Sequence, residues 1–131
     1  MKILIVDDDH ALLSFLTKEL ENRGCDVHQS SRVDGAFHVW QQSGPWELVL
    51  TDYRFPGVKI KNGAHLVAAI HAINPLQTMA MMTSDPHGAR RKLPKALRHL
   101  PILRKPFRLE EVLRLLRQPV LPLDSTGVLG C

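Results

Sequence analysis

Short, largely apolar runs alternate along this chain with segments of helical periodicity, and this alternation restricts the possible folds more than any other feature. Four such runs stop abruptly at polar residues, namely Ile3–Val6, Leu48–Thr51, Met79–Met82 and Ile102–Arg104. A continuous apolar run of this length is typical of a strand buried on both faces. Strands that alternate with helices favour βα units. The sequence therefore predicts an α/β fold with a five-stranded, parallel, doubly wound sheet.

The segments between these runs carry start and stop signals for helices. Leucines recur at helical spacing from residue 12 to residue 20, and Gly24 follows them as a C-terminal cap. Ser31 has the character of an N-cap for the next helix, with Asp34 completing an approximate capping box. Because Pro94 removes a hydrogen-bond donor, we expect a short, irregular fourth helix between residues 86 and 99. The expected strands cover residues 2–6, 25–29, 47–51, 78–82 and 102–103, and two further helices cover about 63–73 and 109–117.

Length and composition set the class of protein. The chain has 131 residues, of which 44% are hydrophobic and 23% charged, and this suits one globular domain. The first apolar run is far too short for a signal peptide or a membrane span, and two cysteines are too few for a disulfide framework. We therefore expect a cytoplasmic protein with one domain over residues 1–117 and a flexible tail over residues 118–131.

Positive charge gathers in the last third of the chain. The net charge is +4, and ten lysines and arginines lie between Arg90 and Arg117, against only Glu110 and Glu111. The simplest interpretation is a solvated helix face, and the alternative is a surface that meets an acidic partner. No helix-turn-helix pattern follows these charges, so we expect no DNA-binding domain.

Acidic residues follow two of the apolar runs, at the point where each predicted strand ends. Asp7 and Asp8 follow the first run, and Asp52 follows the third predicted strand. The carboxyl ends of parallel strands share one edge of the sheet, where ligands bind in open α/β folds. Helix capping accounts for Asp9 but not for Asp52. Converging carboxylates repel unless they are protonated or bridged by a cation, and an oxygen-only site with few protein ligands suits Mg²⁺.

Asp52, Thr83 and Lys105 together indicate phosphoryl chemistry, because each ends a predicted strand at the same edge. A carboxylate beside a cation can attack phosphorus and form an aspartyl phosphate. Lys105 would neutralise the phosphoryl oxygens, and the Thr83 hydroxyl would donate a hydrogen bond to one of them. Taken singly, Thr83 is also typical of a residue that caps a turn, and Lys105 of a surface lysine.

Four motifs in this order and spacing resemble the receiver domain of two-component response regulators, over about residues 2–117. They are ILIVDDD (3–9), LVLTDYRFPG (48–57), MMTS (81–84) and RKPF (104–107). The resemblance implies a flavodoxin-like fold in which Asp52 accepts a phosphoryl group from a histidine kinase or a phosphotransfer protein. It also implies Mg²⁺ binding by Asp7, Asp8, Asp52 and the backbone carbonyl of Arg54. Such a domain is not an enzyme beyond its own phosphorylation and slow dephosphorylation, and it acts through an output protein.

The same resemblance implies that Thr83 and Lys105 contact the phosphoryl group and that the peptide bond before Pro106 is cis. The chain departs from the family pattern at residues 57–62, which have the character of a short insertion. It also departs at Ile102, where an aromatic switch residue is common in the family. The phosphorylation chemistry is therefore expected to be intact. The usual conformational response to phosphorylation, in which a hydroxyl and an aromatic side chain move together, is in question.

Two positions that flank the phosphoryl site in this family are Arg54 and Asp85. We expect these side chains to pair across the mouth of the site, where they would slow the attack of water on an acyl phosphate.

Two other functions remain open from the sequence. A receiver-like module that no longer switches by phosphorylation would dock a partner through its basic late helices. A haloacid-dehalogenase-like phosphohydrolase would use Asp7 as its nucleophile and Asp9 as its second aspartate, with Thr83 and Lys105. The latter pattern lacks the threonine-type residue that usually follows the second aspartate, and it gives Asp52 no role.

Overall fold

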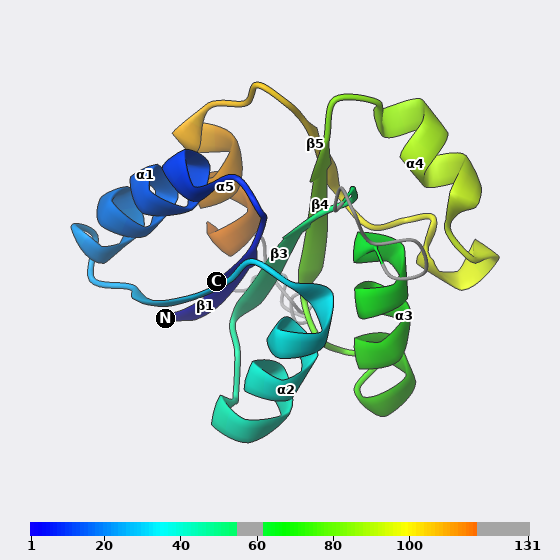
Figure 1. The fold of residues 1–131 in the computed structure, drawn as a ribbon, viewed down its shortest axis with the longest axis horizontal. Helices are drawn as coiled ribbons and strands as arrows, with labels where there is room; N and C mark the ends of the chain where they lie inside the picture. Colours follow the sequence, from blue (N-terminus) through cyan, green and yellow to red (C-terminus); the bar gives the residue numbers. More distant parts are fainter. Residues whose placement is uncertain (55–61, 118–131) are drawn as a thin grey trace, which may run out of the picture.

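The chain forms one parallel sheet with helices on both sides, as the computed structural model shows for residues 1–54 and 62–117 (Figure 1). The five strands lie in the order β2-β1-β3-β4-β5. They are β1 (Lys2–Val6), β2 (Asp26–Ser30), β3 (Leu48–Asp52), β4 (Met79–Thr83) and β5 (Ile102–Arg104). The helices are α1 (His10–Glu21), α2 (Val33–Ser43), α3 (Gly63–Ile73), α4 (Pro86–Lys92) and α5 (Leu109–Arg117), with a 3₁₀ helix η1 (Lys95–Leu97). The predicted doubly wound α/β fold is confirmed.

Each central strand contributes to two hydrophobic clusters, one on each face of the sheet. In β1, Leu4 and Val6 pack with α2, α3 and the α4 region, whereas Ile3 and Ile5 pack with α1 and α5. All four of these side chains are inaccessible to solvent. Burying each one stabilises the fold by about 1.5–3 kcal/mol. This two-sided burial is the reason that the run is continuously apolar instead of alternating.

The register of the strands brings the polar residues to one edge. Val6 pairs with Thr51, and Asp52 pairs with Met82, so the ends of β1, β3 and β4 are level. At the next pair, Thr83 lies opposite Arg104. The residues that follow β1 and β5 therefore flank the last residues of β3 and β4 at the carboxyl edge.

The ends of α1 agree with the capping residues predicted from the sequence, whereas the start of α2 does not. Asp9 is the N-cap of α1, and its side chain accepts from the Leu12 backbone N–H at 3.1 Å. Gly24 has a φ of 86°, a backbone conformation that suits glycine after the end of α1. The prediction that Ser31 caps the second helix is wrong. The N-cap of α2 is Arg32, whose side chain makes no capping bond, because β2 extends to Ser30 and the helix starts later.

The fourth helix is short, as the position of Pro94 predicts. α4 ends at Lys92 after seven residues, and η1 follows Pro94 directly. The Arg90 guanidinium donates to the backbone carbonyls of Arg98 and Leu100, which ties α4 to the segment before β5. The irregular element therefore has hydrogen bonds that hold it in place.

Two predicted features fall largely or wholly outside the described residues. They are the insertion at residues 57–62, of which only Asn62 is described, and the flexible tail at residues 118–131. Asn62 is the N-cap of α3 and forms a reciprocal capping box with His65. Within residues 1–54 and 62–117, no helix combines the length and apolar character needed to cross a bilayer.

Candidate functional site

Three carboxylates meet at the carboxyl edge of the sheet, as the sequence predicts. Asp7 and Asp8 directly follow β1, and Asp52 is the last residue of the neighbouring β3. One oxygen from each lies within 4.8 Å of the others. Asp7 is completely buried and Asp52 nearly so, whereas Asp8 is exposed to solvent. Side chains far apart in sequence therefore form one acidic cluster, which is exposed to solvent at Asp8.

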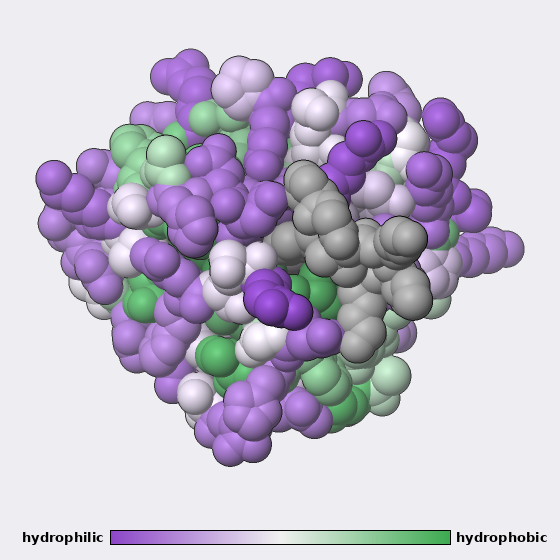
Figure 2. Space-filling view, viewed as in Figure 1, coloured by the Kyte–Doolittle hydropathy of each residue, from purple (hydrophilic) through white to green (hydrophobic). Residues whose placement is uncertain are grey.

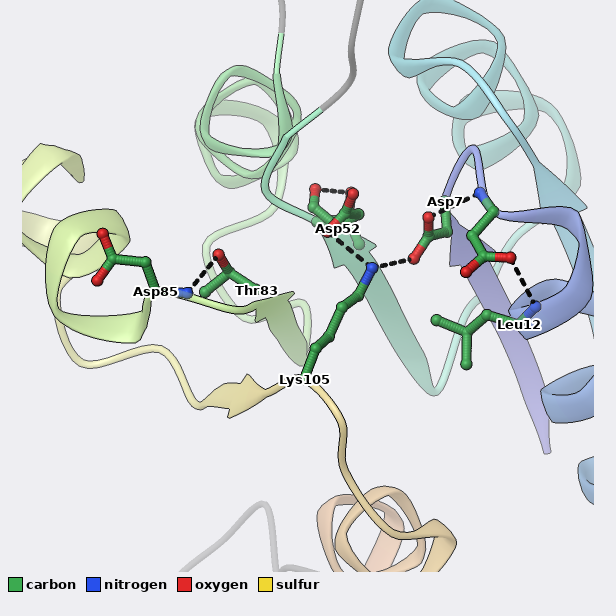
Figure 3. A network of polar contacts seen from close by, with 8 residues as sticks. Asp7, Leu12, Asp52, Thr83, Asp85 and Lys105 are labelled. Carbon is green, nitrogen blue, oxygen red and sulfur yellow. Dashed lines mark hydrogen bonds and ion pairs between the residues drawn. The ribbon is translucent and has the colours of Figure 1, made fainter.

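Lys105 is the cation of this cluster, and Figure 3 shows its side chain reaching toward both buried carboxylates. Its Nζ lies 2.8 Å from Asp7 Oδ2 and 3.1 Å from Asp52 Oδ1. Its backbone N–H donates to the Thr83 carbonyl at 2.8 Å, which extends the pairing of β4 and β5 by one residue. The peptide bond between Lys105 and Pro106 is cis, as the family resemblance implies. The ammonium group thus bridges residues that end two different strands.

Asp7 is fixed in place by bonds to both of its carboxylate oxygens. Oδ1 accepts from the Asp9 backbone N–H at 2.9 Å, and Oδ2 accepts from Lys105. Among the described residues, the Asp52 carboxylate forms one ion pair, to Lys105, and 10% of its side-chain surface is exposed. Of the two buried acids, Asp52 is therefore the one that a reactant can approach.

Negative charge exceeds positive charge in the cluster, and the pKa values reflect it. Burial, together with the neighbouring Asp7 charge, raises the pKa of Asp52 from 3.8 to about 6, although Lys105 opposes this rise. Burial lowers the pKa of Lys105, but its contacts with Asp7 and Asp52 outweigh that effect and leave its pKa raised. One ammonium group does not compensate three carboxylates, so the cluster would gain from further positive charge.

The donor set fits a hard divalent cation. All ligand atoms that the described cluster offers are carboxylate oxygens, and they converge within 4.8 Å. Mg²⁺ prefers such oxygens and retains several waters, so the open side next to Asp8 suits it. Arg54, whose carbonyl the resemblance assigns to the metal, follows β3 by two residues and has an exposed side chain.

Thr83 is buried at the end of β4, next to β3 and β5. Its hydroxyl oxygen accepts from the Asp85 backbone N–H at 3.1 Å, so it does stabilise the turn before α4. A hydroxyl that accepts in this way still has its own proton to donate. The two interpretations of Thr83, as a turn cap and as a phosphoryl contact, are therefore compatible.

The predicted pairing of Arg54 with Asp85 is absent from the ion pairs of residues 1–54 and 62–117. The Asp85 carboxylate is instead the N-cap of α4 and accepts from the Gly88 backbone N–H at 3.1 Å. A Cβ atom on Gly88 would lie 2.1 Å from an Asp85 carboxylate oxygen, so this glycine permits the cap. Capping holds Asp85 on its own helix.

Two residues that sequence reasoning missed hold the backbone of Asp52. A Cβ atom on Gly63 would lie 2.1 Å from the Asp52 carbonyl oxygen, and the Gly63 N–H donates to the Tyr53 carbonyl at 2.9 Å. The buried Thr51 hydroxyl donates to the same Asp52 carbonyl at 3.0 Å. A glycine that opens a helix directly after an irregular connection was the available signal for Gly63. The sequence offered no such signal for Thr51, because a threonine within a strand is common and indicates no particular contact.

Comparisons with known proteins identify the family and agree with the fold. The family model described as the response regulator receiver domain matches residues 3–117. No curated protein matches the chain. The receiver domain of an HD domain-containing protein from Pseudomonas fluorescens Pf-5 is 26% identical, with a TM-score of 0.76 over 88% of this chain and 90% of that one.

Two further solved structures share the fold. The HemR receiver domain from Leptospira biflexa is 25% identical, with a TM-score of 0.75 over 90% of this chain and 95% of that one. A response regulator receiver domain protein from Clostridium thermocellum is 22% identical, with a TM-score of 0.73 over 88% and 90%. Because the family model covers most of the sequence and the fold agrees, this chain belongs to the response regulator receiver domain family.

Proposed function

We propose that the protein is a phosphoacceptor in a cytoplasmic phosphorelay and is phosphorylated on Asp52 by a histidine kinase or a phosphotransfer protein. The observation that carries this proposal is the environment of Asp52. Its carboxylate is buried except for 10% of the side-chain surface, contacts the Lys105 ammonium group and lies beside Asp7 and the exposed Asp8. Asp7, Asp8, Asp52 and the Arg54 carbonyl would hold Mg²⁺.

The reaction would form one bond and break one. A carboxylate oxygen of Asp52 attacks the phosphorus of a phosphohistidine, the P–N bond breaks, and the released imidazole keeps the electron pair and takes up a proton. The product is an acyl phosphate on Asp52. Bound Mg²⁺ would supply charge neutralisation for the phosphoryl oxygens.

Lys105 and Thr83 would stabilise the phosphoryl group from the β4 and β5 side. The Lys105 ammonium group already touches Asp52, so it is positioned to neutralise an oxygen that Asp52 acquires. The Thr83 hydroxyl, anchored by the Asp85 N–H, retains a proton for another phosphoryl oxygen.

The output would be a shift between two surface states read by a separate partner protein. α4 is connected to the site through the bond between Asp85 and Thr83, so the surface around α4, β5 and α5 is where we expect the change. Ile102, which stands where an aromatic switch is common, is half-buried and packs against the core cluster on the α4 side. A partner responds only if it binds one state better than the other.

Incubation with acetyl phosphate and MgCl₂, followed by intact-mass measurement, tests the phosphoacceptor role. We expect one phosphoryl adduct, which should not form when EDTA replaces MgCl₂ and should be absent in Asp52→Ala. Asp26→Ala is the matched control, because Asp26 is an exposed aspartate at the start of the edge strand β2. No adduct on the wild-type protein would instead favour a receiver-like module that does not switch by phosphorylation.

The burial of Asp7 argues against a haloacid-dehalogenase-like hydrolase. In that mechanism Asp7 would attack the substrate, yet Asp7 has no exposed surface and both its oxygens accept hydrogen bonds. We therefore expect no turnover of p-nitrophenyl phosphate by the wild-type protein. Turnover that disappears in Asp7→Asn would reverse this conclusion.

A further inference from the structure

A cavity of about 600 Å³ lies beside α4, outside the acidic cluster. The described residues that line it are all basic: His87, Arg90, Arg91 and Arg98. Figure 2 shows hydrophilic side chains gathered over α4 and the segment that follows it. The phosphoacceptor chemistry uses none of these four residues, so the cavity requires its own explanation.

Backbone carbonyls hold two of the guanidinium groups in place. Arg90 donates through Nη1 to the carbonyls of Arg98 and Leu100, and Arg98 donates through Nε to the Leu93 carbonyl at 3.2 Å. Both groups keep further N–H donors, because an arginine carries five. A ligand that binds here would therefore meet donors that are already ordered, which lowers the entropic cost of binding.

The positive charges in this cavity have no acidic partner in the described part of the chain. The arginine ion pairs found there, Arg23 with Glu19 and Arg108 with Glu110, both lie elsewhere. Arg91 is exposed and makes no hydrogen bond to any described residue. Several like charges around one concavity repel one another, so an anion would relieve that repulsion on binding.

The shape and the donors together select a ligand class. The volume falls within the roughly 300–1,000 Å³ of small-molecule sites, and the planar guanidinium fork matches phosphate oxygens. No Phe, Tyr or Trp is among the described lining residues, so these residues offer guanidinium groups and not the aromatic stacking platform typical of a nucleic-acid groove. We propose that this cavity binds a compact polyphosphate anion, either free pyrophosphate or the diphosphate of a nucleotide, through Arg90, Arg91 and Arg98.

Titration calorimetry on the full chain, in EDTA and at low salt, tests the proposal with pyrophosphate and ADP as probes. We expect both to bind, and the Arg91→Glu variant to bind at least about tenfold more weakly, because a charge-assisted contact is replaced by a carboxylate that repels the anion. Arg114→Glu changes the net charge by the same amount at an exposed position of α5. This variant should bind pyrophosphate within about twofold of the wild-type affinity. Tighter binding of ADP than of pyrophosphate would identify the nucleotide as the source.

Amide NMR spectra locate the bound pyrophosphate on the protein. Arg91→Gln serves as a second variant, which removes the positive charge of Arg91 without reversing it. Pyrophosphate should shift the amides of residues 87–98, with the amides of Thr83 and Lys105 unmoved. Four results would overturn the proposal: no binding at millimolar pyrophosphate, equal weakening in the Arg91 and Arg114 variants, shifts confined to the acidic cluster, or tighter binding of hexaglutamate. The last result would assign the cavity to an acidic protein segment.

Discussion

The acidic cluster and the basic cavity beside α4 concentrate opposite charges by different physical means. Asp7 and Asp52 are buried at the carboxyl ends of β1 and β3, and one lysine contacts both. Arg91 and Arg98 are exposed, and the more deeply placed Arg90 donates to backbone carbonyls. Buried charge is expensive unless it is paired, whereas solvated charge costs little.

This difference separates what each region does to the folded state. The pKa of Asp52 is raised mainly by burial, which means that its ionised form is held at a cost in stability. Substitutions in the acidic cluster should therefore change stability and function together, whereas those in the basic cavity should change binding alone.

Replacing Lys105 should have the largest effect on stability. Lys105→Met removes the ammonium group that contacts Asp7 and Asp52, and leaves buried negative charge without a cation. We expect a loss of about 3 kcal/mol in the free energy of unfolding at pH 7.5 without Mg²⁺, measured by urea denaturation. Added MgCl₂ should restore part of it, because a ligand that binds only the folded state stabilises that state. A change below about 0.5 kcal/mol would mean that the cluster is much better hydrated than its burial indicates.

Gly63→Ala tests whether close packing of α3 positions the phosphoacceptor. A Cβ atom there would meet the Asp52 carbonyl at 2.1 Å, and backbone yields little, so we expect a loss of about 2–3 kcal/mol by thermal or urea unfolding. Phosphorylation by acetyl phosphate should slow as well. Gly35→Ala is the matched control on α2, where the nearest atom is the Ser30 hydroxyl at 3.3 Å. If both variants phosphorylate at the wild-type rate, Gly63 does not position Asp52.

Asp52→Asn should stabilise the protein at neutral pH, by about 1–2 kcal/mol. The folded-state pKa, about 6, exceeds the unfolded value of 3.8, so the penalty of ionising Asp52 is fully present above pH 6. It declines as the pH falls through 6 and is gone below about 4. Urea unfolding from pH 4 to pH 8 should therefore show the variant's advantage growing with pH. An advantage that is constant with pH would exclude this electrostatic origin.

Arg91→Gln should change stability least, by less than about 0.5 kcal/mol, because Arg91 is exposed and makes no hydrogen bond to a described residue. Thermal unfolding with and without pyrophosphate measures this directly. A large loss in the absence of any ligand would show that Arg91 supports α4, and the contrast between the two regions would then fail.

Local signals in the sequence predicted features that depend on a few neighbouring residues. The continuous apolar runs predicted β1, β3, β4 and β5 within one or two residues, since strands buried on both faces show no polar alternation. Asp9 and Gly24 act at the ends of α1 as their residue types indicate. The predicted N-cap at Ser31 was wrong because β2 extends to Ser30, where pairing with β1 outweighed the local capping preference of Ser31.

The order of polar residues at strand ends determined, from sequence alone, which side chains form the candidate site. Only the tertiary structure decided how they are connected. Lys105 contacts Asp7, 98 residues away in the chain, by extending over the ends of β3 and β4, which lie between β1 and β5 in the sheet. Asp85 caps α4 instead of pairing with Arg54, and Gly63 lies against the Asp52 backbone. Such contacts depend on strand register and on the close approach of separate elements, which residue types along one segment do not encode.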